Sequence, residues 1–164
     1  MQLYVSSVSN LTDARFFSAY GVQYFGFCFD ALNPNAITTD KARAIISWLH
    51  EPKIIGQFGE HQRREEMQYV DSQVSLSGVQ ITPGHPEMDK IEKPKWIATE
   101  KGILEENTTG IYISALWTKE LLEHAVSQQP YGIHISSSGE ESPGSSNVEY
   151  YAELMEILAP HLVR

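Results

Sequence analysis

A short run of small polar residues is the part of the sequence best suited to bind a charged ligand: Ser136, Ser137, Ser138 and Gly139. Tyr131–Ile135, just before it, is apolar at alternate positions as a β-strand is, and Asn147–Leu158 after it has a helical pattern. Turn N–H groups and a helix N-terminus both favour negative charge, so this arrangement predicts an anion cradle. An ordinary loop has the same composition, and both interpretations stay open.

Other side chains offer weaker chemistry. His85, Glu87 and Asp89 are types that ligate metals, but two prolines beside them favour a surface loop, and we expect neither a metal nor a cofactor. His61 lies in a charged segment that indicates a solvated helix face. Cys28 is the only cysteine, so it can form no internal disulfide, and a reducing cytoplasm is the expected setting.

Size and charge bound the kinds of protein this can be. With 164 residues, 41% of them hydrophobic, the chain predicts a single domain over residues 1–164. A formal net charge of −9 without a basic run argues against nucleic acid or an anionic membrane as partner. A strand expected almost at Met1 leaves no room for a signal peptide, and no apolar run is long enough to span a bilayer.

The elements that must position these residues alternate between strand and helix. The predicted strands are Leu3–Ser7, Tyr24–Phe29, Ile54–Phe58, one centred on residues 78–82, Trp96–Thr99, Ile111–Ala115 and Tyr131–Ile135. The predicted helices are one that Asn10 or Thr12 caps and Gly21 ends, then Asp40–Trp48, Glu60–Tyr69, Thr118–Ser127 and Asn147–Leu158. Strand–helix alternation implies an α/β fold with parallel strands, and by itself leaves open a doubly wound sheet or a reduced barrel.

Several stretches resemble one enzyme family. PYGIHISSSGEESPG, from Pro130 to Gly144, resembles the last strand and loop of the phosphoribosylanthranilate isomerases of tryptophan biosynthesis. Leu3–Phe29 resembles their first unit without a gap, Val79–Ile81 their fourth strand, and Ile111–Ile135 their last two strands with the helix between. The resemblance implies a TIM-type (β/α) barrel covering most of the chain.

One strand of that barrel has no counterpart. About seven strands are predicted, and only about a dozen residues separate Thr99 from Ile111, too few for a crossover helix and another strand. We therefore expect a reduced or incomplete barrel with an exposed edge. The loop Glu100–Gly110, a homodimer or another protein would have to cover it.

The resemblance also implies where the site lies, and shows that its residues are changed. The family's general base is a cysteine at the position of Ser6, and its general acid is an aspartate at the position of His134. The substrate- and phosphate-binding positions that it implies are Asn35, Gln80, Ser114, Ala115, Ser136, Ser137, Ser138 and Gly139. Ser114 and Ala115 replace paired glycines, and with Trp117 they are expected to crowd the approach of phosphate, leaving weak anion binding at Ser136–Gly139.

Three functions follow as hypotheses. The first is an isomerase homologue that is catalytically impaired, because losing an acid or a base costs roughly 10²–10⁴-fold in rate. The second is a non-catalytic scaffold, or a protein that binds a phosphorylated small molecule on the same barrel. The third is an altered sugar-phosphate enzyme in which His134 activates Ser6, against the simpler interpretation of His134 as a hydrogen-bonded barrel histidine.

Overall fold

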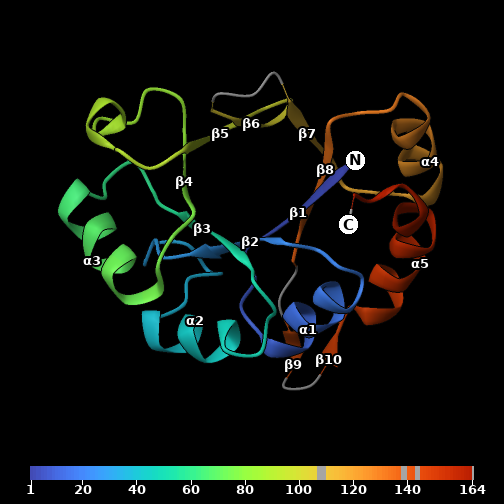
Figure 1. Cartoon of the computed structure of the whole chain (residues 1–164), viewed down its shortest axis with the longest axis horizontal. Coiled ribbons are helices and arrows are strands. Elements are labelled where there is room, and N and C mark those ends of the chain that lie inside the picture. Colours follow the sequence, from blue (N-terminus) through green and yellow to red (C-terminus); the bar gives the residue numbers. More distant parts are fainter. Residues whose placement is uncertain (107–109, 138–139, 143–144, 164) are drawn as a thin grey trace.

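Eight strands close into a barrel in the order of the sequence (Figure 1). The computed structural model describes residues 1–106, 110–137, 140–142 and 145–163. The barrel strands are β1 (Gln2–Ser6), β2 (Tyr24–Cys28), β3 (Lys53–Gln57), β4 (Gly78–Ile81), β5 (Lys95–Thr99), β6 (Gly102–Glu105), β7 (Ile111–Ser114) and β8 (Gly132–Ser136). The ladder between β1 and β8, where Ser6 pairs with Ser136, joins the two ends of the sheet.

Helices cover part of the barrel wall. In the described part of the chain they are α1 (Leu11–Ala19), α2 (Thr39–Ile46), α3 (Arg64–Val74), α4 (Lys119–Ser127) and α5 (Val148–Leu158), with short 3-10 helices η1 (Met88–Lys90) and η2 (Ala159–His161). A small antiparallel pair, β9 (Glu140–Ser142) and β10 (Ser145–Ser146), lies between β8 and α5 in the sequence. Figure 1 shows the α-helices around the rest of the barrel, whereas only the short η1 lies near β5 and no helix stands outside β6 and β7.

The expected gap in the barrel is filled by β6. The TIM-type fold is confirmed, but the seven predicted strands are joined by an eighth that runs antiparallel to both β5 and β7. An antiparallel strand needs only a short turn, such as Glu100–Lys101, whereas a parallel one needs a crossover of a dozen residues or more. The edge is not left exposed: of the expected coverings, the segment Glu100–Gly110 is the one found, because it contains β6, which is paired on both sides.

Aromatic side chains fill the middle of the barrel. Tyr4, Trp96 and Tyr112 pack together, with ring centroids 4.8 Å apart for Tyr4 and Trp96 and 4.9 Å apart for Trp96 and Tyr112. Small residues opposite make room: a β-carbon at Gly26 would lie 2.2 Å from the Tyr4 hydroxyl oxygen. Gly102 is needed for another reason, since its φ of +143° aims a β-carbon at the Tyr112 carbonyl oxygen. The barrel has a packed interior below its mouth.

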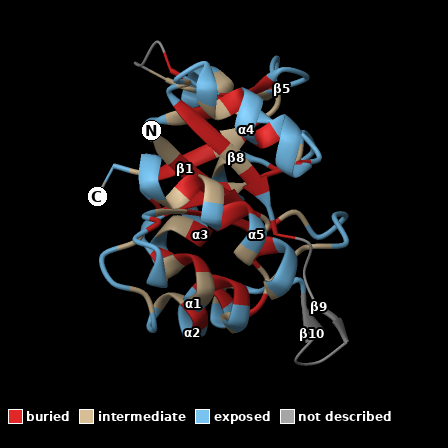
Figure 2. Cartoon of the chain, turned by 90° about the vertical axis from the view of Figure 1, so that its right-hand side faces the viewer, coloured by how far each residue is buried: buried red, intermediate tan, exposed pale blue. Residues whose placement is uncertain are grey.

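A second, larger core lies between the barrel and its helices. Phe17, Leu122 and Tyr151 are fully buried against strand residues such as Val5 and Ile133. Figure 2 shows these buried segments along β1, β8 and the inner faces of the helices. Asn10 begins α1 as predicted, because its Oδ1 accepts a hydrogen bond of 2.7 Å from the Asp13 backbone N–H. The core thus fixes α1 and α5 beside the strands that end at the barrel mouth.

One helix is displaced from its prediction. The segment Glu60–Tyr69 was expected to be helical, but α3 spans Arg64–Val74. Residues 59–62 form a turn instead, closed by the Gln62 backbone N–H on the Gly59 carbonyl. The Arg63 backbone N–H donates to the Glu66 carboxylate at 2.8 Å, which marks the true start of the helix.

Candidate functional site

Polar side chains gather at the barrel mouth, where the parallel strands end. Side chains alternate along a strand, so the residues that continue the inward-facing rows of Tyr4, Gly26 and Tyr112 point to the axis. At the mouth these are Ser6, Cys28, Gln57, Gln80, Ser114 and His134. Active sites of such barrels occur at this end.

His134 is hydrogen-bonded on both sides of its ring. Its Nε2 lies 2.6 Å from the Ser6 hydroxyl oxygen, and its Nδ1 lies 2.8 Å from the Ser114 hydroxyl oxygen. A neutral imidazole has one donor and one acceptor nitrogen, so one serine donates to the ring and the other accepts from it. The three side chains, from β1, β7 and β8, form one chain across the mouth.

Burial keeps His134 uncharged. Desolvation lowers the pKa of His134 from 6.5 to about 4. At neutral pH the ring is therefore neutral, which matches its two hydrogen bonds to hydroxyl groups. A weakly basic imidazole is also a weak general base, and it is not available in the charged form that would act as a general acid.

The other half of the mouth is closed by glutamines. The Tyr4 hydroxyl donates to Gln80 Oε1 at 2.6 Å, and burial holds the pKa of Tyr4 well above its ordinary value. The Ser7 backbone N–H, held at a positive φ of 55°, donates to Gln57 Oε1 at 2.8 Å. These bonds fix the orientation of both amide groups through their oxygens.

The space above these glutamines is small. A cavity of about 120 Å³ is lined by Cys28, Asp30, Asn33, Gln57 and Gln80, among others. Pockets for small molecules usually have about 300–1,000 Å³. This cavity has room for a few waters and, without movement, none for a phosphorylated sugar.

The predicted anion loop is tied to the fold at Ser137. The Ser137 hydroxyl donates to Asp13 Oδ2 at 2.5 Å, and its backbone N–H donates to the Ser6 carbonyl oxygen at 2.9 Å. Both donors of Ser137 are thus used, and the side chain is buried. Ser136 is exposed beside it, while Ser138 and Gly139 lie outside the described residues.

The remaining predicted positions do not join this chain. Asn35 lies in the loop between β2 and α2 with its backbone N–H bonded to Asn33 Oδ1, and Ala115 is exposed after β7. Trp117 does not crowd the mouth as expected: it is buried, and its Nε1–H donates to the His134 carbonyl oxygen at 2.8 Å. Its position is explained by packing in the outer core, which draws the indole inward.

Two residues of the site, Asp13 and Gln57, were not predicted from the sequence. Asp13 lies in the segment Leu3–Phe29 that resembles the family and was given no role, yet it is fully buried and its Oδ1 has no hydrogen-bond partner. Gln57 occupies the end of β3 as Gln80 does in β4, and the two match each other in register. That repeated glutamine near a strand end was the available signal, whereas the Asp13–Ser137 contact joins residues too distant in sequence to be paired by pattern.

The histidine of the second candidate cluster is structural. His85 is buried, with its Nε2 3.1 Å from the Gly59 carbonyl oxygen and its Nδ1 accepting from the Glu87 backbone N–H. Among the residues that the structure describes, no group of three or more His, Cys, Asp or Glu side chains could hold a metal ion. None of the helices in that part of the chain is long and apolar enough to cross a membrane.

Solved structures with the same fold are phosphoribosylanthranilate isomerases. The enzyme from Thermus thermophilus is 21% identical, with 98% of this chain and 99% of that chain covered and a TM-score of 0.73. A monomeric form of the dimeric enzyme from Thermotoga maritima is 20% identical, with coverages of 99% and 100% and a TM-score of 0.75. A third, in complex with reduced 1-(o-carboxyphenylamino)-1-deoxyribulose 5-phosphate, is 19% identical, with coverages of 99% and 100% and a TM-score of 0.72.

The fold predicted from the resemblance is thereby confirmed over nearly the whole chain. No protein-family model and no curated protein matches the sequence. A barrel retained at such low identity is consistent with strong divergence of the residues on it.

Proposed function

We propose that this chain is a divergent homologue of the phosphoribosylanthranilate isomerases, impaired in the Amadori rearrangement. The likeness in fold to three such enzymes supports the descent. The impairment rests on Ser6 and His134, which occupy the positions that the resemblance assigns to the base and the acid. A cytoplasmic location belongs to the same proposal, supported by a single cysteine that is buried and free.

The observation that carries the proposal is the Ser6–His134–Ser114 chain. The rearrangement needs an acid at the ring oxygen of the sugar and a base near its C2. A neutral His134, with a pKa near 4 and both nitrogens bonded to serines, is a poor donor of a proton at pH 7. Ser6 is a far weaker acid than the cysteine it replaces, so it supplies no ready base.

Complementation of a tryptophan auxotroph tests this proposal. We expect no growth with the wild-type chain at ordinary expression, and a kcat/KM of the purified protein at least roughly 10²-fold below that of an active isomerase. The variant Ser6→Cys/His134→Asp restores both residue types that the resemblance assigns, with Lys41→Gln on the exposed face of α2 as a control. Growth of the auxotroph with the wild-type chain would contradict the impairment.

A changed enzyme is the second candidate, favoured by the 2.6 Å contact between Ser6 and His134. In that case His134 activates the Ser6 hydroxyl toward another phosphorylated sugar, with Ser114 orienting the ring. A fluorophosphonate probe distinguishes the candidates, because it labels activated serines. Labelling of Ser6 that His134→Gln abolishes would establish the pair, whereas an unlabelled Ser6 leaves the impaired homologue or a scaffold.

Binding of a phosphorylated small molecule is a finer part of the proposal. We expect it to be weak and confined to the Ser136–Gly139 loop, because Ser137 donates to Asp13 and Ser6 instead. Ribose 5-phosphate, titrated against backbone amide shifts, is the probe. Tight saturable binding that also shifts Ser114 and Ala115 would favour an intact substrate site.

A homodimer remains a prediction, with the outer face of β6 and β7 in place of an open edge as the surface that it would cover. The closed barrel has no open edge, but Leu104 and Ile111 pair across β6 and β7 and are 39% and 45% exposed. No helix stands outside these strands in Figure 1, so a second copy would cover this apolar face. Sedimentation of the wild type beside Leu104→Glu tests it, and a wild-type monomer at high concentration would exclude it.

A further inference from the structure

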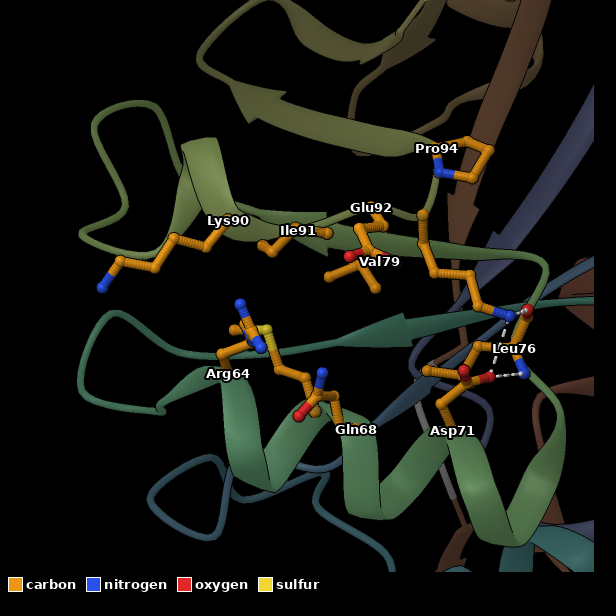
Figure 3. A pocket seen from close by; sticks show the side chains of 11 residues that line it. Arg64, Gln68, Asp71, Leu76, Val79, Lys90, Ile91, Glu92 and Pro94 are labelled. Carbon is orange, nitrogen blue, oxygen red and sulfur yellow. Dashed lines mark hydrogen bonds and ion pairs between the residues drawn. The ribbon is translucent and has the colours of Figure 1, made fainter.

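A groove runs along the outer wall of the barrel, away from the mouth (Figure 3). It has a volume of about 360 Å³ and lies between α3 and the segment Lys90–Pro94 that leads into β5. Only the three-residue η1 connects β4 to β5 where a full helix would cover the wall. The shortened connection is what leaves the groove open.

Apolar side chains form the floor of the groove. Met67 of α3, Leu76 before β4, Val79 of β4 and Ile91 are all buried in the fold and line it. A concave apolar surface of this size suits a small molecule with an apolar body. The polar groups at the rim then determine which small molecule binds.

Most charges at the rim are already paired. Lys93 Nζ lies 3.0 Å from Asp71 Oδ1 and donates to the Leu76 carbonyl oxygen at 2.6 Å. Lys90 Nζ lies 3.1 Å from Glu87 Oε2 and points away from the floor in Figure 3. These lysines are therefore occupied within the protein.

Two charged residues of the rim, Glu92 and Arg64, form no ion pair within the described part of the chain, and of these only Arg64 is a cation. Its Nε is shielded from solvent and has no hydrogen-bond partner. Its guanidinium forms no hydrogen bond or ion pair with any other described residue. Figure 3 shows the side chain rising from α3 toward Ile91, across the groove. A guanidinium without a partner inside the protein is available to an acceptor that a ligand supplies.

We infer that this groove binds a small apolar carboxylic acid, with its carboxylate on Arg64 and its apolar body on Met67, Val79 and Ile91. A guanidinium matches a carboxylate in geometry and charge. A monoanion is favoured over a phosphate dianion because Glu92, which lines the same groove without an ion pair, repels a second negative charge. The site is separate from the mouth, so it is independent of the proposed function.

Titration of the wild-type protein with 4-phenylbutyrate and with uncharged 4-phenylbutan-1-ol tests the inference. We expect the acid to shift the backbone amides of Gln68, Leu76 and Ile91 saturably, and to bind at least roughly tenfold tighter than the alcohol. Equal affinity of acid and alcohol, absence of saturable binding by the acid, or shifts confined to the mouth would overturn it.

Variants then assign the charge. Arg64→Gln should bring the acid to the affinity of the alcohol, whereas Lys41→Gln, the same change of charge on the exposed face of α2, should leave it unchanged. Glu92→Gln should leave binding of the acid unchanged or tighten it. Retained discrimination between acid and alcohol in Arg64→Gln would overturn the assignment, and the wild-type comparison stands even where a variant fails to fold.

Discussion

The barrel mouth and the outer groove differ in how their polar groups are matched. At the mouth, both ring nitrogens of His134 are bonded to serines, and Gln57 and Gln80 accept from Ser7 and Tyr4. In the groove beside α3, the Nε of Arg64 is buried and unpaired. A ligand entering the mouth must replace bonds that exist, whereas one entering the groove supplies a bond that is missing.

This difference separates position in the fold from readiness to bind. Barrels of this type have their active sites at the mouth. Here the polar side chains of the mouth bond mainly to one another, above the packed rings of Tyr4, Trp96 and Tyr112. Hydrogen bonds between neighbours stabilise the fold where both groups have partners, as along the chain from Ser6 to Ser114, although Asp13 Oδ1 beside Ser137 has none. The comparison therefore predicts that the mouth contributes to stability and that Arg64 detracts from it.

The largest expected effect is a loss of stability in acid through His134. Its pKa of about 4 in the folded state lies below the ordinary 6.5, so the unfolded chain binds the proton more readily. Stability from this group is complete above pH 6.5 and is lost as the pH falls toward 4, by about 2–3 kcal/mol at pH 4.5. Urea unfolding of wild type and His134→Gln at pH 7.5 and 4.5 measures it, and an equal loss in both proteins would contradict the assignment.

A smaller effect is expected at Ser137. Ser137→Ala removes the hydroxyl that donates to Asp13 Oδ2, and it leaves a fully buried carboxylate whose Oδ1 already lacks a partner. The free energy of unfolding should fall by about 1–3 kcal/mol. Ser136→Ala is the matched control, since Ser136 is exposed and should change stability by less than about 0.5 kcal/mol. Equal effects at the two serines would show that the Asp13 contact contributes nothing.

The smallest effect has the opposite sign. Arg64→Met keeps the aliphatic stem of the side chain but removes an unpaired buried nitrogen, so the free energy of unfolding should rise by about 0.5–1 kcal/mol. Arg43→Met is the control, because Arg43 is exposed and paired with Asp40, and it should be neutral or slightly destabilising. If Arg64→Met lowered the free energy of unfolding by more than about 1 kcal/mol, the proposed difference between mouth and groove would be wrong.

Local sequence patterns predicted most of the helices and strands, and they predicted one pair of neighbouring site residues, Ser6 and His134. The strands that carry Ser6 and His134 were recognised because their alternation and their resemblance lie within continuous segments, and the structure brings the two together. The start of α3 was misplaced, since it depends on the Arg63–Glu66 contact and on a turn closed by Gln62. Helical charge patterns continue through such turns, so periodicity alone does not locate them.

Features that depend on contacts between residues distant in the chain could not be predicted from the sequence. β6 is a four-residue strand whose direction is decided by the need to close the barrel between β5 and β7. Trp117 turns inward because the outer core has room for it, and Ser137 faces Asp13 across more than a hundred residues. Each depends on where other elements finally lie, which single-sequence patterns do not encode.

The hairpins of β5, β6 and β7 also have a consequence for the order of folding. They pair strands that are adjacent in the chain, so their contact order is low and closing their loops costs little entropy. The β1–β8 ladder joins residues near opposite ends of the chain, with Gln2 beside Gly132, and its closure is entropically the most expensive step. Folding should therefore begin on the side without helices and finish where Ser6 meets His134, which makes formation of the mouth the last event of the fold.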